Sequence, residues 1–400
     1  MTYTATRRGT YCGFVVMAIL SNLSPLLFII FQDNFGFSYE RLGLLIVMYF
    51  SVQIASMGIG IVVVERIGYR IPVVFSQCCA VLGLVLLGIL PTVMDNTFAG
   101  LIIATALSAV GCGLIELTFS PIMDALPAPP NQKASAMSFM HSFYCWGVAV
   151  TIIISTLFLH VFGAAAWWFL PILWALLPLF NLILFINVPL PEHTEKKERT
   201  PVKELFSAPL FLLLILLMVC GAASELVVAQ WASLFMEQGL GLSKVIGDIA
   251  GPCMFAVLMG VGRILYSIFS NKISYRVYMI VSALLCVMCY LLISLSSNPI
   301  FSMIGCALSG LAVSMMWPGT LSYAVSRFPS GGTVLFGTLS FFGLLGCSLG
   351  PWVTGVVADN TDGGLRTGIL VSVIFPALIV ILVLTLVKKN TQTAANKTQN

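Results

Sequence analysis

The sequence has few charged residues and only three histidines. Lys, Arg, Asp and Glu make up 8% of its 400 residues, whereas soluble domains carry about a quarter. This excludes an ordinary water-soluble fold, and the net charge of +4 gives no reason to expect nucleic-acid binding. Because His141, His160 and His193 are scattered along the chain, we expect no enzyme, no metal site and no other cofactor.

The sequence also lacks a complete set of metal-binding cysteines. All of the eleven cysteines lie inside apolar stretches, and Cys286-x-x-Cys289 has no second ligand pair of the kind that a structural zinc site needs. We interpret the cysteines as small apolar packing residues.

Long apolar runs are abundant, with 59% hydrophobic residues and a mean hydropathy of +1.03. A bilayer-spanning helix needs about 20 apolar residues. Charges, prolines and short polar loops divide the chain into twelve such stretches: 10–31, 40–64, 71–92, 98–125, 134–160, 166–188, 207–236, 244–270, 277–296, 300–327, 332–358 and 366–387. The sequence therefore predicts an all-α polytopic membrane protein with 12 transmembrane helices.

The loop cations predict the orientation. One side holds Arg7, Arg8, Arg66, Arg70, Lys133, Lys196, Lys197, Arg199, Lys203, Lys272, Arg276, Arg327, Lys388, Lys389 and Lys397, and the other side holds Arg41, Lys244 and Arg366. The positive-inside rule then places both termini and the loop from Pro189 to Leu205 in the cytoplasm. We expect a multi-pass protein of the cytoplasmic (inner) membrane of a bacterium, because the loops are short and no targeting extension is evident.

Two short basic loops indicate an internal repeat. "ERIGYRIPVV" begins at Glu65 and "NKISYRVYMI" begins at Asn271, about half the chain later. The repeat predicts two pseudo-symmetric six-helix halves. Residues 1–188 form the first half, 189–206 a cytoplasmic linker, 207–388 the second half and 389–400 a cytoplasmic tail.

The first basic loop resembles the signature of the major facilitator superfamily, G-x-L-A-D-R-x-G-R-K. Glu65, Arg66, Gly68 and Arg70 occupy its charged and turn positions, and the second copy has Ser274 in place of the glycine. The resemblance implies a cytoplasmic gate held by ion pairs at helix ends, in which Asp124 would pair with Arg66 or Arg70. The gate candidates are Glu65, Arg66, Arg70, Asp124, Arg263, Lys272 and Arg276.

Several segments resemble the fucose:proton symporter branch of that superfamily. They are "SNLSPLLFIIFQDNFGFSYERLGLL", "GCGLIELTFSP", "HSFYCWG", "GAASELVVAQW", "VGRILYSIFSNKISYR" and "MMWPGTLSYAV". This resemblance implies uptake of a sugar together with a proton. The branch has an aspartate on its first span, where this chain has Pro25, so uncoupled facilitation stays open.

One glutamate, Glu116, interrupts a long apolar run. Ser108, Cys112, Glu116, Ser120 and Asp124 recur every four residues and so form a slowly winding polar stripe on one helix. A charge at mid-membrane costs about 2.5 to 3.5 kcal/mol, so Glu116 is expected to be neutral when it is shielded from water. We expect it to carry the coupling proton; a hydrogen-bonded packing role is the alternative.

A second acid, Glu225, lies in the predicted seventh span. One acid from each half would bracket a solute in a central cavity, and a carboxylate accepts hydroxyl hydrogen bonds. Trp231 offers a flat apolar face, although aromatic packing explains it equally well. The substrate-binding candidates are Glu225, Trp231, Asn22, Gln53, His141, Tyr144 and Trp317. Pro318 is expected to break the tenth span beside Trp317.

We therefore expect a monomeric carrier in a lipid bilayer that imports a small polar solute, a monosaccharide or polyol, by alternating access and proton symport. Sodium could replace the proton, because a carboxylate beside hydroxyl oxygens serves either ion. An exporter of amphipathic compounds is the first alternative, although the fifth span lacks the Gly-Pro motif of drug antiporters. A membrane enzyme or non-transporting sensor is the second.

Overall fold

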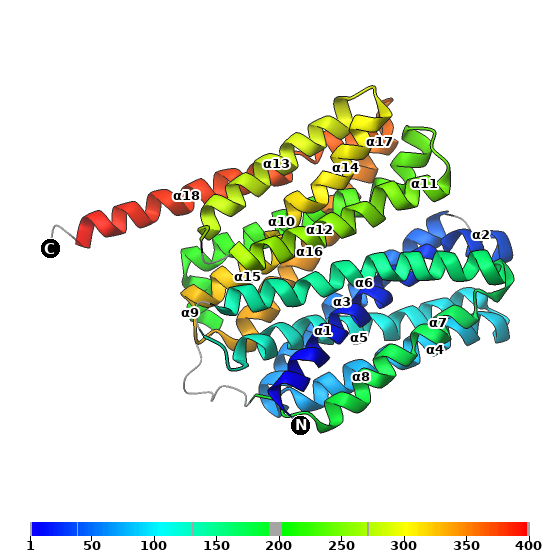
Figure 1. Ribbon diagram of the computed structural model, residues 1–400, viewed down its shortest axis with the longest axis horizontal. Helices are drawn as coiled ribbons and strands as arrows, with labels where there is room; N and C mark the ends of the chain where they lie inside the picture. Colours follow the sequence, from blue (N-terminus) through cyan, green and yellow to red (C-terminus); the bar gives the residue numbers. More distant parts are fainter. Residues whose placement is uncertain (1, 38, 130–131, 192–201, 270–271, 398–400) are drawn as a thin grey trace. The chain divides into compact units, whose positions relative to one another are not determined.

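The computed structural model describes residues 2–37, 39–129, 132–191, 202–269 and 272–397, and in these segments all regular structure is helical (Figure 1). The first half of the sequence contains α1 (Tyr3–Leu26), α2 (Phe28–Phe35), α3 (Tyr39–Ile67), α4 (Arg70–Val93), α5 (Thr97–Ala125), α6 (Lys133–Phe162), η2 (Ala164–Ala166), α7 (Phe169–Trp174) and α8 (Leu176–Asn187). Then follow α9 (Val202–Ser207), α10 (Pro209–Leu234), η4 (Phe235–Gly239), α11 (Lys244–Asp248), η5 (Ile249–Cys253), α12 (Met254–Phe269), α13 (Tyr275–Leu295), α14 (Pro299–Val313), α15 (Met316–Arg327), α16 (Gly332–Asp359), α17 (Gly364–Val371) and α18 (Ile374–Lys397).

Within the described segments, twelve helical stretches are long and apolar enough to cross a membrane, which confirms the predicted number of spans. The first span begins at Tyr3 and not near residue 10. The last helix continues to Lys397 and takes in part of the stretch expected to be a tail. Hydropathy marks the part of a helix that is apolar enough for the bilayer, whereas a polar extension can continue the same helix. Residues 192–201 of the predicted linker lie outside the described residues, and α9 follows them.

Side-chain caps and prolines set several helix starts. The side chains of Asn96, Ser274 and Asn298 accept hydrogen bonds from backbone N–H groups in the first turns of α5, α13 and α14. Pro209 and Pro299 lie in the first turns of α10 and α14, where a missing N–H costs no helical bond. These local signals place helix ends where the polar loops begin.

The two basic loops of the repeat turn in different ways. Gly68 has a φ of +76° between α3 and α4, a conformation that glycine adopts without strain. In the second loop, Ser274 is extended (φ −65°, ψ 142°) and caps α13. The serine therefore does not need the left-handed conformation that requires glycine in the first copy.

The tenth span is discontinuous. We expected the break at Pro318, but α14 ends at Val313 and α15 starts at Met316, so the break is at Ser314 and Met315. Proline has no backbone N–H and its ring clashes with the carbonyl four residues earlier. The break therefore falls four residues before Pro318, at the carbonyl of Ser314, and the expected position was wrong for this reason.

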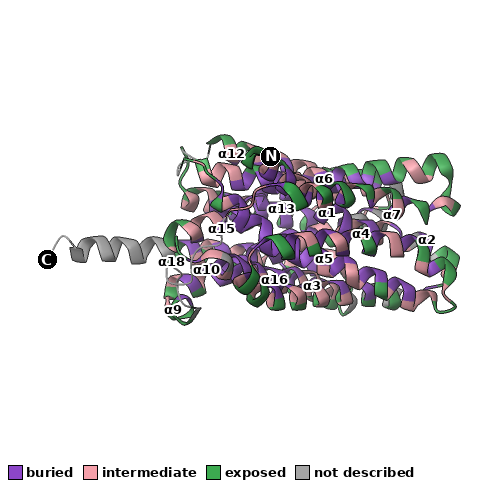
Figure 2. Ribbon diagram, turned by 90° about the horizontal axis from the view of Figure 1, so that it is seen from below, coloured by how far each residue is buried: buried purple, intermediate pink, exposed green. Residues whose placement is uncertain are grey.

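The chain divides into two compact units. The first comprises Met1–Pro129, Phe143–Arg199 and Gly332–Phe341; the second comprises Pro130–Ser142, Thr200–Gly331 and Phe342–Asn400. Small residues allow helices to pack closely within each unit. In the first, Gly83 of α4 lies against the backbone of Ser108 in α5; in the second, Gly310 of α14 lies against the carbonyl of Phe255 in α12. Figure 2 shows buried residues along helix faces and exposed residues on the opposite faces, as expected for helices in lipid.

Two spans contribute to both units. The start of α6, up to Ser142, belongs to the second unit, and its remainder belongs to the first. The start of α16, Gly332–Phe341, belongs to the first unit, and its remainder belongs to the second. These two spans are the fifth and the eleventh, and so they are equivalent in the repeat.

Candidate functional site

Glu116 is buried within the first unit. Its side chain is only 4% exposed, and its Oε1 accepts a hydrogen bond of 3.2 Å from the hydroxyl of Ser340 in α16. The other members of the polar stripe on α5 are also buried up to Ser120, since Ser108, Cys112 and Ser120 are enclosed, whereas Asp124 at the helix end is half-buried. One polar contact of Glu116 is thus made by the α16 segment that packs into this unit.

The α16 segment is fitted closely around Glu116. A Cβ at Gly337 would come within 2.6 Å of Ile61 in α3 and 2.7 Å of Leu117 in α5. Glycine therefore lets α16 approach these two helices, one turn before Ser340. We call this group of contacts the α16 docking site; it consists of Glu116, Leu117, Ile61, Gly337 and Ser340.

A group of uncharged polar residues lies elsewhere in the first unit. The Asn22 side chain donates to the carbonyl of Ala18 at 2.8 Å and to Ser21 Oγ at 2.9 Å. The hydroxyls of Ser21 and Tyr144 are 3.3 Å apart. Gln53 is 5% exposed. The structure thus brings together Asn22 and Tyr144, two of the predicted solute ligands, through Ser21.

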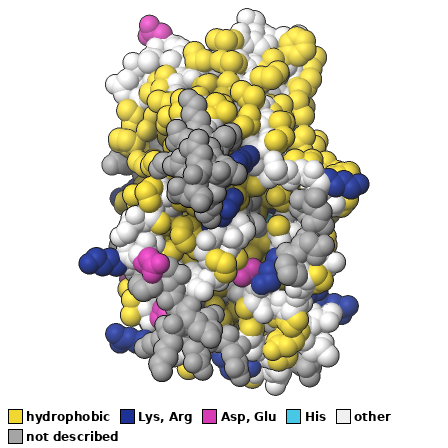
Figure 3. All heavy atoms as spheres, turned by 90° about the vertical axis from the view of Figure 1, so that its left-hand side faces the viewer, with side chains coloured by type: hydrophobic (Ala, Val, Ile, Leu, Met, Phe, Trp, Pro, Cys, Tyr) yellow, Lys and Arg dark blue, Asp and Glu magenta, His cyan; other side chains and the backbone are white. Residues whose placement is uncertain are grey.

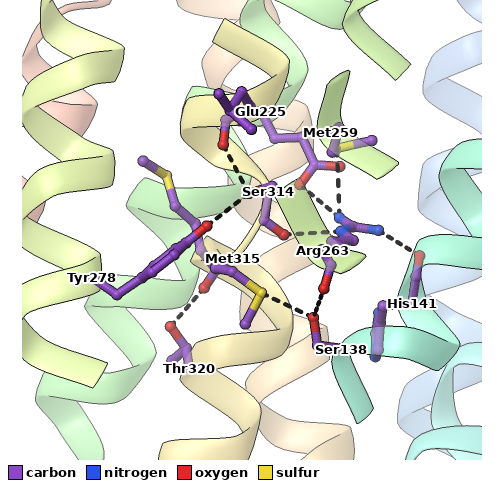
Figure 4. Close-up of polar contacts among 11 residues, drawn as sticks. Ser138, His141, Glu225, Met259, Arg263, Tyr278, Ser314, Met315 and Thr320 are labelled. Carbon is purple, nitrogen blue, oxygen red and sulfur yellow. Dashed lines mark hydrogen bonds and ion pairs between the residues drawn. The ribbon is translucent and has the colours of Figure 1, made fainter. Parts of the chain in front are cut away.

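In the second unit, Arg263 of α12 is the centre of a buried polar network (Figure 4). Its Nε donates to the carbonyl of Ser314 at 2.9 Å, and its Nη1 donates to the carbonyl of His141 at 2.8 Å. Its Nη2 lies 3.5 Å from Glu225 Oε2 and 3.5 Å from the sulfur of Met259. The guanidinium therefore connects α6, α10 and the broken tenth span within one unit.

Ser138 completes this network from the start of α6. Its hydroxyl donates to the carbonyl of Arg263 at 2.6 Å and lies 3.2 Å from the sulfur of Met315. We call this set of groups the Arg263 network; it consists of Arg263, Glu225, Ser314, Ser138 and the carbonyl of His141. Figure 4 shows these groups converging on the break in the tenth span.

Glu225 is 8% exposed and serves as the counter-charge of Arg263. A buried charge is strongly unfavourable unless it is paired and hydrogen-bonded, so this ion pair explains how both groups are tolerated. At 3.5 Å the contact is longer than a tight charge-assisted hydrogen bond. This leaves lone pairs on the carboxylate for a second donor.

The two predicted tryptophan ligands differ. The indole N–H of Trp231 donates to the carbonyl of Pro351 at 3.1 Å, and its ring lies 3.0 Å from the Cβ position of Gly355. Trp231 therefore has only a ring face to offer to a solute. Trp317 packs against Gly343, and its buried Nε1 has no hydrogen-bond partner.

The gate candidates lie at helix ends or in loops, except for Arg263. Figure 3 shows several Lys and Arg side chains on one face of the molecule. Arg70 donates to the carbonyls of Phe185, Ile186 and Val188 at 2.9 to 3.1 Å, which caps the C-terminus of α8. Lys272 lies over the ring of Phe269, Arg66 is exposed, and Glu65, Asp124 and Arg276 are half-buried. Their pairing in a gate stays a prediction.

Sequence reasoning missed three functional candidates, Ser138, Ser314 and Ser340. A serine in an apolar helix carries no distinctive signal, and the acceptor at Ser314 is a backbone carbonyl. The only signal available was Pro318, which indicates that a carbonyl four residues earlier needs another donor. Among the described residues, no three His, Cys, Asp or Glu side chains are grouped to hold a metal ion.

Twelve apolar helices in two repeated sets of six, with buried acids in both units, are typical of a membrane transporter. The sequence profile described as Major Facilitator Superfamily matches residues 10–351 and 253–400. The chain therefore belongs to the Major Facilitator Superfamily, and it is a transporter with the fold that was predicted. No curated protein matches the chain.

Solved structures have the same fold at low sequence identity. FucP, a Major Facilitator Superfamily transporter in its outward conformation, has a TM-score of 0.78 and 14% identity, covering 94% of this chain and 97% of that chain. A variant of the E. coli fucose:proton symporter FucP has a TM-score of 0.75 and 16% identity, covering 96% and 98%. The proton:xylose symporter XylE, bound to 6-bromo-6-deoxy-D-glucose, has a TM-score of 0.82 and 13% identity, covering 96% and 95%.

Proposed function

We propose that this transporter imports a monosaccharide or polyol by proton symport, with Glu116 as the proton carrier. The observation that carries the proposal is the burial of Glu116 against Ser340. A carboxyl group there can be neutral while enclosed and can ionise when one side of the membrane gains access to it. FucP and XylE, both described as sugar and proton symporters, support the substrate class.

The proposed solute ligands are polar groups found in both halves of the sequence. Asn22, Gln53 and Tyr144 come from the first half and Glu225 from the second, and all four side chains can bond to hydroxyl groups. Alternating access would expose these groups to each side of the inner membrane in turn, with both chain termini in the cytoplasm. The gate residues at the helix ends would hold the cytoplasmic side shut.

A substrate is needed first. Purified protein is melted with a panel of sugars, polyols, amino acids and lipophilic cations; a ligand at 100 times its Kd stabilises the fold by about 2.7 kcal/mol. We expect the melting temperature to rise only with sugars or polyols. A rise confined to lipophilic cations would instead support an exporter of amphipathic compounds.

The coupling claim is tested with Glu116→Gln in proteoliposomes. The substitution keeps the shape but removes ionisation, so we expect solute exchange to remain and accumulation driven by a pH gradient to be lost. Glu204→Gln, at an exposed position in α9, is the matched control and should accumulate normally. Unchanged accumulation by Glu116→Gln would refute the role of Glu116 as the proton carrier. Accumulation by the unsubstituted protein under a sodium gradient would show that sodium, and not the proton, is the coupling ion.

A further inference from the structure

Arg263 supplies the hydrogen-bond donor that Pro318 removes from the tenth span. In a continuous helix, the N–H of residue 318 would bond to the carbonyl of Ser314. Proline has no such N–H, and Arg263 Nε donates to this carbonyl at 2.9 Å. The guanidinium also lies at the C-terminal end of α14, where a positive charge complements the helix dipole.

The same guanidinium holds the start of α6. Arg263 Nη1 donates to the carbonyl of His141, and the carbonyl of Arg263 accepts from Ser138. One turn before Ser138, the hydroxyl of Ser135 bonds to the carbonyl of Ser267 in α12 at 2.7 Å. The start of α6, Lys133–Ser142, is thus fastened to α12 at two successive turns, while the rest of α6 belongs to the other compact unit.

We propose that Arg263 is a positioning residue for transport: it fastens the start of α6 to the break in the tenth span, and this attachment opens once in each cycle. This rests on the proposed alternating-access function, and α6 is a candidate for a moving part because its two segments belong to different units. When the start of α6 separates, Arg263 loses its hydrogen bonds with His141 and Ser138. It retains its hydrogen bond to the carbonyl of Ser314 and its ion pair with Glu225. The charge therefore stays paired inside its own unit in both states.

Detachment can be measured without a substrate. Ser142 lies at the end of the fastened segment, is 1% exposed and bonds only within its own helix at 2.7 Å. The reporter is Ser142→Cys in protein carrying Cys12→Ser and Cys78→Ser, because these two native cysteines are half-buried and the other nine are buried. The readout is the rate at which a maleimide labels residue 142.

Two substitutions weaken the attachment in this background. Arg263→Lys keeps the charge but cannot hold three acceptors in the same geometry, and Ser138→Ala removes one hydroxyl. We expect each to raise the labelling rate about fivefold, the change in equilibrium typical of losing one hydrogen bond. The matched controls are Arg327→Lys, at an exposed position in the last turn of α15, and Ser309→Ala, at a buried serine of α14 that bonds only to Cys306 in its own helix. They should leave the rate unchanged.

A disulfide tests whether the attachment must open. The hydroxyls of Ser135 and Ser267 are 3.0 Å apart, so Ser135→Cys with Ser267→Cys should cross-link under oxidation. We expect the cross-linked protein to lose solute exchange and to regain it on reduction. Full exchange by the cross-linked protein would refute the claim that the attachment opens in each cycle. Unchanged labelling rates in both Arg263→Lys and Ser138→Ala would refute the claim that Arg263 fastens the start of α6. If no sugar or polyol is transported, the proposed substrate fails while the labelling result stands.

Discussion

At the scale of single residues, rarity was the most useful signal. Glu116, Glu225 and Arg263 were recognisable in the sequence because charges inside apolar spans are costly, and the structure shows all three to be buried. Their partners were not predictable. Ser340 is far from Glu116 in sequence, and the contacts of Arg263 include two backbone carbonyls, which have no residue-specific signature.

Glycine positions give a residue-scale prediction. A Cβ at Gly346 would lie 2.2 Å from the carbonyl oxygen of Val219, whereas one at Gly58 would meet its nearest neighbour at 3.9 Å. Gly346→Ala should therefore destabilise the protein by about 1 to 3 kcal/mol through overpacking, because a backbone atom cannot move aside cheaply. Gly58→Ala should be neutral or slightly stabilising. Thermal unfolding in detergent measures both, and equal melting temperatures would contradict the assigned packing.

At the scale of helices, apolar length predicted the twelve spans, but the interruptions needed tertiary structure. The first span is divided at Leu27, shortly after Pro25, and the tenth is divided at Ser314 and Met315. Proline identifies a weak point, while the residue at which a helix breaks depends on which donor satisfies the freed carbonyl. Hydropathy likewise could not predict that one segment each of α6 and α16 packs with a different unit from the rest of its helix.

The tenth span gives a prediction at this scale. Pro318→Ala restores an N–H that can bond to the carbonyl of Ser314, which would compete with Arg263 for this acceptor. We expect α14 and α15 to join, the melting temperature to stay the same or rise, and solute exchange to fall severalfold. Pro209→Ala, at the first turn of α10 where no bond is lost, should change neither quantity. Normal exchange by Pro318→Ala would show that the break is dispensable.

At the scale of the whole molecule, the exposed side chains define the lipid-facing surface. Large apolar residues are exposed along the spans of both units, among them Leu284 in α13 at 48%. In a soluble protein such a surface would cause aggregation, whereas in a membrane it is the expected contact with acyl chains. The amino-acid composition alone predicted that the protein lies in a lipid bilayer, because composition does not depend on how the helices pack.

The lipid-facing surface can be tested with a charge. Leu284→Arg places a guanidinium near the middle of α13 and should cost about 2.5 to 3.5 kcal/mol on insertion, which would lower the amount of folded protein in the membrane. Ile273→Arg, at a similarly exposed position before α13, is the control and should insert normally. Membrane yield and size-exclusion profiles compare the two; equal yields would mean that Leu284 does not face lipid.

The hydrogen bond between Ser340 and Glu116 joins an ionisable group to a helix segment, and thermodynamic linkage makes such a connection reciprocal. If protonation of Glu116 changes the equilibrium constant for packing of Gly332–Phe341 by some factor, then packing of this segment must change the proton affinity of Glu116 by the same factor. A ligand, an antibody fragment or a lipid that holds α16 in place would then alter proton binding without touching the carboxylate.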